Sequence, residues 1–141
     1  MITNPNISQF IGVALKTEYD LPRIVEKGLP TDNLQLLREA GLTFTEVSEI
    51  IISPRTLKHR KSRGEALSHE ETDRVVRMAR VIGQAETVFG NREKALLWLR
   101  TPDDRLDDDQ ADRTPLSMLR TESGGRLVEE MLWQIAEGIY T

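Results

Sequence analysis

Apolar residues recur three to four positions apart along most of the chain, as they do on one face of an α-helix. The pattern is clearest in 69–82, where Val75, Met78 and Ile82 would share a face. The three β-branched residues at 50–52 are too few to indicate a strand. We therefore predict an all-α chain without internal repeats. Its expected helices are 7–15, 22–27, 31–40, 43–51, 54–62, 69–82 with a continuation to 89, 92–100, 114–119 and 122–138.

Capping residues set several of these boundaries. Thr43 and Ser53 are good N-caps, because their hydroxyl oxygens can accept a bond from an otherwise unpaired backbone N–H. Pro54 suits the first helical turn, where its missing N–H costs nothing. Ser68 and Glu71 form a capping box at the start of the long helix. These local signals make the middle of the chain the best-defined part of the prediction.

Charge is distributed unevenly along this acidic chain, whose formal net charge is −4. Residues 53–63 hold five Lys or Arg and no acid, whereas residues 101–141 hold four bases and ten acids. A basic segment in an acidic protein suits a polyanionic partner such as the phosphate backbone of DNA. The asymmetry predicts one surface for nucleic acid and another for a different partner.

Helices 31–40, 43–51 and 54–62, with a tight turn at Ile52, predict a compact helix-turn-helix whose last helix reads DNA. The glycine common in such turns is absent, and two isoleucines stand there instead. Leu57 is expected to face inward, toward Val47 and Ile50.

That orientation points Arg55 and His59 away from the core, where an arginine can make a bidentate contact with guanine. Lys61 and Arg63, near the helix end, suit phosphates better than bases. The alternative is a basic surface helix that never touches a base. The candidate DNA-binding residues are Arg55, Thr56, Lys58, His59, Lys61, Ser62 and Arg63.

The final helix combines an apolar stripe with a tryptophan that lies outside it. The stripe comprises Leu127, Val128, Met131, Leu132, Ile135 and Ile139. Trp133 lies about 160° from its centre at the 100° per residue of an α-helix. Its neighbours there are Arg126, Glu130 and Glu137. Tryptophan and arginine are enriched where proteins bind one another, so this face is a candidate binding surface. Packing of Trp133 within the chain is the alternative.

Residues for catalysis or metal binding are sparse, so we expect no enzyme activity, no cofactor and no metal. The chain has two His and no Cys, and it shows no Ser-His-Asp pattern, metal-ligand spacing or phosphate-binding glycine loop. The Asp-rich stretch 102–113 lacks the glycine and terminal glutamate of a calcium loop. No apolar run approaches the ~18 residues that suggest a membrane span, and the N-terminus does not look like a signal peptide. We therefore expect a cytoplasmic protein without membrane contact.

Short motifs in a fixed order resemble the Xre/MbcA/ParS antitoxins. In the C-terminal part they are Leu-Arg-Thr-Pro at 99–102, Arg-Thr-Pro-Leu at 113–116, Thr-Glu-Ser-Gly at 121–124 and Gly-Ile-Tyr at 138–140. Upstream they are Lys-Gly-Leu-Pro at 27–30, Pro-Arg-Thr-Leu at 54–57 and Leu-Ser-His-Glu-Glu-Thr-Asp-Arg at 67–74. The resemblance covers about 20–141, and the Asp-rich insert before Arg113 departs from it.

The resemblance implies an Xre-like helix-turn-helix bundle followed by a small helical toxin-binding domain. We accordingly divide the chain into an N-terminal segment 1–20, a DNA-binding domain 21–83 and a toxin-binding domain 84–141. It further implies a type II antitoxin that forms a homodimer, covers the active site of a NAD-consuming RES-domain toxin and represses its own operon by binding operator DNA. The alternative is a stand-alone helix-turn-helix regulator whose C-terminal domain dimerises or senses a ligand. The candidate toxin-binding residues are Arg126, Glu130, Trp133, Glu137, Ile139, Tyr140 and Thr141.

Overall fold

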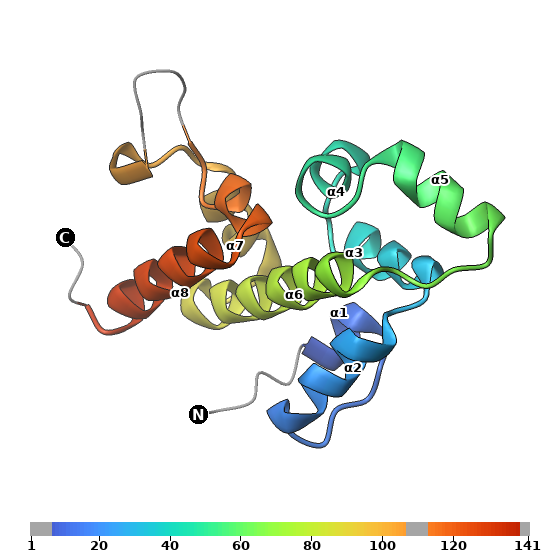
Figure 1. Cartoon of the computed structure of the whole chain (residues 1–141). Coiled ribbons are helices and arrows are strands. Elements are labelled where there is room, and N and C mark those ends of the chain that lie inside the picture. Colours follow the sequence, from blue (N-terminus) through green and yellow to red (C-terminus); the bar gives the residue numbers. More distant parts are fainter. Residues whose placement is uncertain (1–6, 107–112, 139–141) are drawn as a thin grey trace. The chain divides into compact units, whose positions relative to one another are not determined.

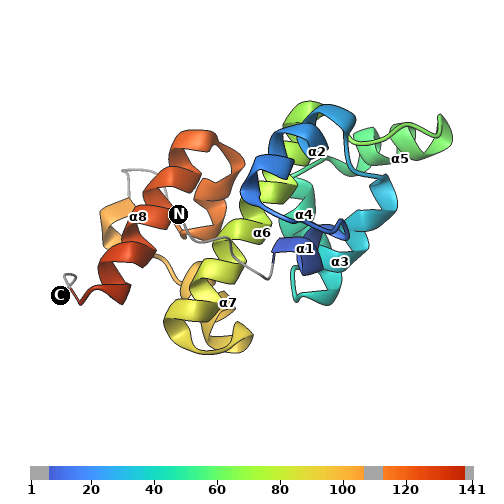
Figure 2. The ribbon, with the colours of Figure 1, turned by 90° about the horizontal axis from the view of Figure 1, so that it is seen from below.

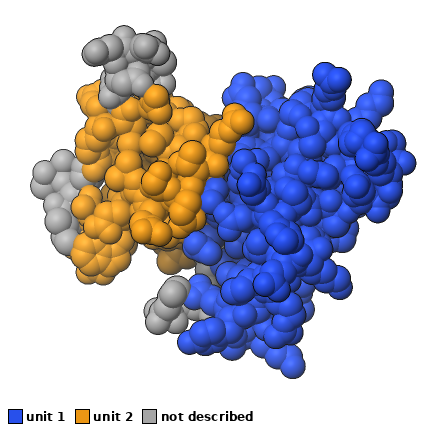
Figure 3. All heavy atoms as spheres, viewed as in Figure 1, with its two compact units in different colours: residues 1–80 blue, residues 81–141 orange. Residues whose placement is uncertain are grey.

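A computed structural model describes residues 7–106 and 113–138, and in these ranges it contains helices and no strand. The all-α prediction is thereby confirmed. The chain divides into two compact units, 1–80 and 81–141, which are coloured separately in Figure 3.

The first unit contains five short α-helices, two 3-10 turns and the start of a longer helix (Figure 1). In chain order these are α1 (Ile7–Ile11), η1 (Glu18–Asp20), α2 (Leu21–Lys27), η2 (Thr31–Asn33), α3 (Leu34–Glu39), α4 (Phe44–Ile50), α5 (Pro54–Ser62) and α6 (His69–Phe89). Helices α1 and α3 lie side by side in both ribbon views (Figures 1 and 2). The interior is apolar and includes the fully buried Phe10, Leu37, Ile51, Val75 and Met78.

The second unit begins within α6, which is one unbroken helix of 21 residues. It continues with α7 (Arg92–Arg100), η3 (Asp104–Leu106), η4 (Leu116–Arg120) and α8 (Glu122–Ala136). The amide of Gln84 on α6 donates to the backbone carbonyl of Glu129 on α8 over 3.2 Å. The rings of Phe89 and Trp98 pack 5.5 Å apart and connect α6 to α7.

Local capping explains most helix boundaries. Thr43 and Glu46 make a reciprocal capping box at the start of α4, and Ser68 and Glu71 make another at the start of α6. Helix α5 ends in a Schellman motif: Gly64 has φ +65°, and the backbone N–H of Glu65 donates to the carbonyl of Arg60 over 2.9 Å.

Four boundary predictions were wrong. The helix expected in 7–15 ends at Ile11, because the Asn33 amide donates to the Ile11 carbonyl and Gly12 turns the chain at φ +75°. The segments 31–33 and 116–120 form 3-10 turns where α-helix was expected. The final helix ends at Ala136, two residues early, because Gly138 adopts φ +70°. Such ends depend on partners distant in sequence or on one backbone angle, which periodicity does not report.

Gly124 lets the start of α8 approach η4 closely. A Cβ built on Gly124 would collide with the backbone carbonyl of Met118, which cannot move as the tip of a flexible side chain can. The Gly124 N–H also donates to the Thr121 hydroxyl over 3.0 Å. Gly124 therefore serves packing at a helix start.

We predict that Gly124→Ala lowers the free energy of unfolding by about 1–3 kcal/mol, the usual cost of overpacking. The collision should outweigh the helix-propensity gain of about 1 kcal/mol that alanine brings. Urea denaturation followed by circular dichroism measures the change. Ser123→Ala, at the exposed neighbouring position, is the matched control and should stay near wild type. A Gly124→Ala protein as stable as the control would show that α8 and η4 can separate without cost.

Candidate functional site

Helix α5 presents most of the predicted DNA-binding residues on one outward face. Its start is fixed by Ser53, whose hydroxyl accepts from the Thr56 backbone N–H over 3.2 Å. Arg55, Lys58, His59 and Ser62 are exposed. These four and Thr56 line one shallow hollow on the protein surface. In Figures 1 and 2 the helix lies at the edge of the first unit.

The opposite face of α5 carries the inward-facing residue that was expected. Leu57 is half-buried, and with Val47 it lines a groove bounded by α3, α4 and the start of α5. Lys61 lies on that side as well, where it borders the same groove near Asp32. Arg63 is exposed at the C-cap of the helix. Lys61 and Arg63 thus stand apart from the five residues around the hollow.

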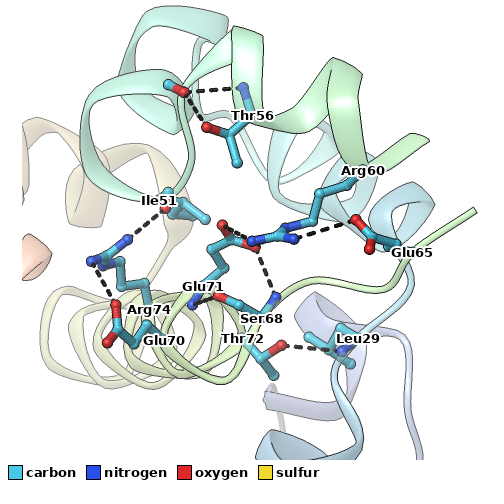
Figure 4. Close-up of polar contacts among 11 residues, drawn as sticks. Leu29, Ile51, Thr56, Arg60, Glu65, Ser68, Glu70, Glu71, Thr72 and Arg74 are labelled. Carbon is cyan, nitrogen blue, oxygen red and sulfur yellow. Dashed lines mark hydrogen bonds and ion pairs between the residues drawn. The ribbon is translucent and has the colours of Figure 1, made fainter. Parts of the chain in front are cut away.

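Arg60 has a role that sequence analysis missed. Its guanidinium makes a two-pronged ion pair with Glu71 on α6, with Nε–Oε1 at 2.7 Å and Nη2–Oε2 at 3.1 Å (Figure 4). A longer contact of 3.6 Å joins Arg60 Nη1 to Glu65. The capping box was a signal for this pair, because it fixes the Glu71 carboxylate and leaves oxygen lone pairs for a second partner.

Glu71 is a nearly buried carboxylate, with 7% of its surface exposed. It accepts from Arg60 and from the Ser68 backbone N–H over 2.8 Å. Burial alone would raise the pKa of Glu71, but the hydrogen bonds from Arg60 and Ser68 outweigh burial and hold the pKa below its usual value. The same pairing raises the pKa of Arg60. Both groups therefore remain charged at neutral pH.

The turn before α5 needs no glycine, because its backbone stays in ordinary regions. Ile51 has φ −108°, and the backbone N–H groups of Ile51 and Ile52 both donate to the Val47 carbonyl. Both isoleucine side chains are buried in the core. The Ile51 carbonyl accepts from Arg74 on α6 over 3.1 Å (Figure 4). Buried side chains and an arginine thus fix a turn that glycine usually shapes.

Helix α8 buries its stripe only in part. Val128, Met131 and Leu132 are buried and Ile135 is half-buried, as expected, but Leu127 is 43% exposed. The apolar stripe is therefore core only in part, because the packing surface of α8 is narrower than the apolar arc of its sequence. Ile139 lies outside the described residues.

The face predicted to bind a partner is open to solvent. Trp133 is 49% exposed, and Arg126, Glu130 and Glu137 are exposed with it. A hollow nearby is lined by Glu122, Ser123, Arg126, Leu127 and Glu130. Trp133 has no aromatic partner among the residues that the structure describes. The predicted binding residues Ile139, Tyr140 and Thr141 fall outside the described ranges.

The Asp-rich segment is described only at its two ends, outside 107–112. Both carboxylate oxygens of Asp103 contact the guanidinium of Arg105, at 3.0 and 2.8 Å. The hydrogen bonds from Arg105 hold the pKa of Asp103 below its usual value. Within 7–106 and 113–138, no group of three His, Asp or Glu residues could hold a metal ion. In the same ranges no helix has the length and hydrophobicity needed to cross a bilayer.

Comparison with known proteins accounts for both units. Residues 20–80 match the antitoxin Xre-like helix-turn-helix domain, and residues 84–138 match the antitoxin Xre/MbcA/ParS C-terminal toxin-binding domain. The chain is 38% identical over 124 residues to a protein from Pseudomonas putida named Antitoxin Xre. These 124 residues are 88% of this chain and 76% of that protein. The chain belongs to the Xre family of antitoxins. A second family member, Antitoxin Xre from Yersinia enterocolitica, is 31% identical over 91 residues, or 64% of this chain and 59% of that protein.

The exposed faces of α5 and α8 lie in two different domains of this family. Helices α4 and α5 lie within the residues that match the helix-turn-helix domain, and α8 lies within those that match the toxin-binding domain. The chain is thus an Xre-family antitoxin with a DNA-binding domain and a toxin-binding domain, as the resemblance indicated.

We predict that Glu71→Gln lowers the free energy of unfolding at pH 7 by about 1.5–3 kcal/mol, the range for a hydrogen bond to a charged group. Because the folded-state pKa of Glu71 is lowered, the stabilisation is complete above the unfolded value of about 4.3. It disappears as pH falls through the folded value. The difference between wild type and variant should therefore be constant from pH 7 to about pH 5 and shrink in more acidic solution.

Thermal or urea unfolding between pH 7 and pH 3 measures this difference. The control is Glu70→Gln, whose carboxylate is exposed and lies 4.0 Å from Arg74. Such surface pairs contribute about 0–1 kcal/mol. Equal effects of the two substitutions would mean that the Glu71 pair adds nothing beyond surface charge.

Proposed function

We propose that this Xre-family antitoxin neutralises a RES-domain toxin that consumes NAD, by covering the toxin's active site, and represses its own operon by binding operator DNA. We further propose that it acts as a homodimer in the cytoplasm and has no catalytic activity of its own. The observation that carries the proposal is the pairing of two exposed surfaces of opposite character on one chain. One is the cationic face of α5, and the other is the tryptophan-bearing face of α8.

The α5 face supports base reading. Arg55 and His59 are one helical turn apart and exposed, with Lys58 and Ser62 beside them around one hollow. An arginine held there by a capped helix start can make a bidentate contact with guanine. Lys61 and Arg63 are assigned to phosphates, which supply affinity without sequence information.

The α8 face supports protein recognition. Trp133 leaves half of its surface exposed in a protein whose other tryptophan packs against Phe89. Arg126, Glu130 and Glu137 surround it on one helical face with mixed charge. An exposed aromatic ring bordered by polar residues is typical of binding hot spots. The terminal residues Ile139, Tyr140 and Thr141 complete the proposed contact.

The second candidate function is a stand-alone regulator whose C-terminal domain only dimerises or senses a ligand. Co-purification with a RES-domain toxin from the neighbouring gene decides between the two. Removing α8 would also remove Val128 and Leu132 from the core, so surface substitutions are the cleaner test.

We predict that Trp133→Ala weakens the toxin complex by roughly 2 kcal/mol or more, about a thirtyfold rise in Kd, as expected for a hot spot. Calorimetry or surface plasmon resonance with an inactive toxin measures Kd. Leu97→Ala is the matched control. Leu97 lies on α7 in the same unit, and 68% of its surface is exposed. An unchanged Kd for Trp133→Ala would contradict the proposed contact.

We predict that Arg55→Ala weakens operator binding by about 1–3 kcal/mol and relaxes the base preference at one position, while binding to random DNA changes little. Arg63→Ala should weaken both equally, as a phosphate contact does. Arg23→Ala, which removes the same charge from an exposed site on α2, controls for net charge. The measurement is anisotropy titration on operator and random duplexes. Equal losses on both duplexes for Arg55→Ala would make Arg55 a phosphate contact.

Footprints of a dimer should show two half-sites about one helical turn, or a multiple, apart.

A further inference from the structure

Helix α5 is held by polar contacts to a degree unusual for a helix that must be placed accurately. None of its nine residues, all of which the structure describes, is buried. Leu57 supplies only half-buried apolar contact. An ordinary surface helix is fixed by an apolar stripe buried against the core, which α5 lacks. Other interactions must therefore set its orientation.

Two arginine contacts connect the α5 region to α6. At the C-terminal half, Arg60 bonds to both oxygens of Glu71. Just before the start of α5, the backbone carbonyl of Ile51 accepts a hydrogen bond from Arg74 on α6. Glu71 and Arg74 are three residues apart and lie on one face of α6. Figure 4 shows Glu71 in contact with Arg60 on α5 and Arg74 in contact with Ile51 before it.

The base of this arrangement is itself fixed. Thr72 is fully buried, and its hydroxyl accepts from the Leu29 backbone N–H over 3.1 Å. The Leu67 backbone N–H in turn donates to the Leu29 carbonyl over 2.9 Å. The first turns of α6 are thus tied to the segment after α2, and they form a rigid reference for α5.

The geometry points to Arg60, Glu71 and Arg74 as positioning residues that set the orientation of α5 for base reading without contacting DNA themselves. This inference rests on the proposed operator binding and adds to it. It reverses the simple interpretation of the basic segment, in which Arg60 would be one more phosphate contact. Reading base edges requires side chains placed within a fraction of an ångström, whereas phosphate attraction tolerates displacement. Loss of the contacts should therefore reduce discrimination more than affinity for any DNA.

Glu71→Gln separates positioning from charge, because the two effects have opposite signs. Removing a negative charge from a DNA-binding domain should tighten binding to every duplex. Loss of positioning should instead weaken operator binding. We expect the ratio of operator to random-DNA affinity to fall roughly tenfold or more, about the value of one good base contact. Binding to random DNA should stay equal or become tighter. Glu39→Gln removes the same charge from an exposed position on α3 and should leave the ratio intact.

The same titrations should include two variants of Arg60, Arg60→Lys and Arg60→Gln. Arg63→Gln is the control for a lost positive charge on the same segment. A lysine keeps the charge but cannot bridge both carboxylate oxygens. Arg60→Lys should therefore lose discrimination while the dependence of log Kd on log salt stays unchanged. Arg63→Gln should lower both affinities and flatten that dependence. Circular dichroism and thermal melting establish that each full-length variant is folded at the titration temperature.

Two results would overturn the inference. In the first, Glu71→Gln binds operator as well as Glu39→Gln with the same discrimination. In the second, Arg60→Lys matches wild type while Arg60→Gln loses affinity equally on both duplexes with a flatter salt dependence, which would make Arg60 a phosphate contact. If the wild-type protein itself shows no preference for its upstream DNA, the proposed operator binding fails and the inference falls with it. That outcome is distinct from a loss confined to the variants.

Discussion

The carboxylate of Glu71 is the group on which the geometry of the DNA-binding domain depends. It accepts the Ser68 backbone N–H and so completes the first turn of α6, and it receives the guanidinium of Arg60 from α5. A nearly buried charge is tolerable only when such partners replace the water it has lost. One side chain thus bonds both to the first turn of α6 and to α5.

This dependence follows from the composition of α5. Helix α5 carries cations and polar groups around most of its surface, which leaves little apolar area to bury. Its cations also repel one another, since no acid occurs in 53–63. The compensating acids come from outside the helix, with Glu65 in the following loop and Glu71 on α6. The pairing of Arg60 with Glu71 therefore reduces the repulsion among the cations of 53–63 and holds the helix, while Arg55 and Lys58 stay exposed.

Sequence patterns could predict interactions that close within three or four residues. The caps at Thr43, Ser53 and Ser68 were correct because each bond joins an N-cap residue to the first helical turn. The outward face of α5 also followed from helix geometry once Leu57 was placed inward. Whether the residues around that hollow bind bases stays a prediction.

What periodicity could not supply were contacts between segments. The Arg60–Glu71 pair joins two helices across a loop, and the bond from Asn33 that ends α1 spans 22 residues. Gly124 is fixed by an approach to the Met118 backbone, which no side-chain pattern encodes. Leu127 has the right residue type and spacing for the core but lies beyond the packed arc of α8. Each failure is a case in which tertiary packing overrides a local signal.

The two proposed binding surfaces differ in the kind of interaction that each can use. Under the proposed function, the α5 face attracts DNA over about a Debye length, near 8–10 Å at physiological salt, and then reads it at short range. The described part of α8 carries Arg126 amid Glu122, Glu129, Glu130 and Glu137, so its charge would oppose DNA. Trp133 instead offers a desolvation gain that requires a complementary protein surface. Under the proposed function, the exposed cations of α5 favour DNA and the acids around Trp133 oppose it, so each surface discriminates against the partner of the other.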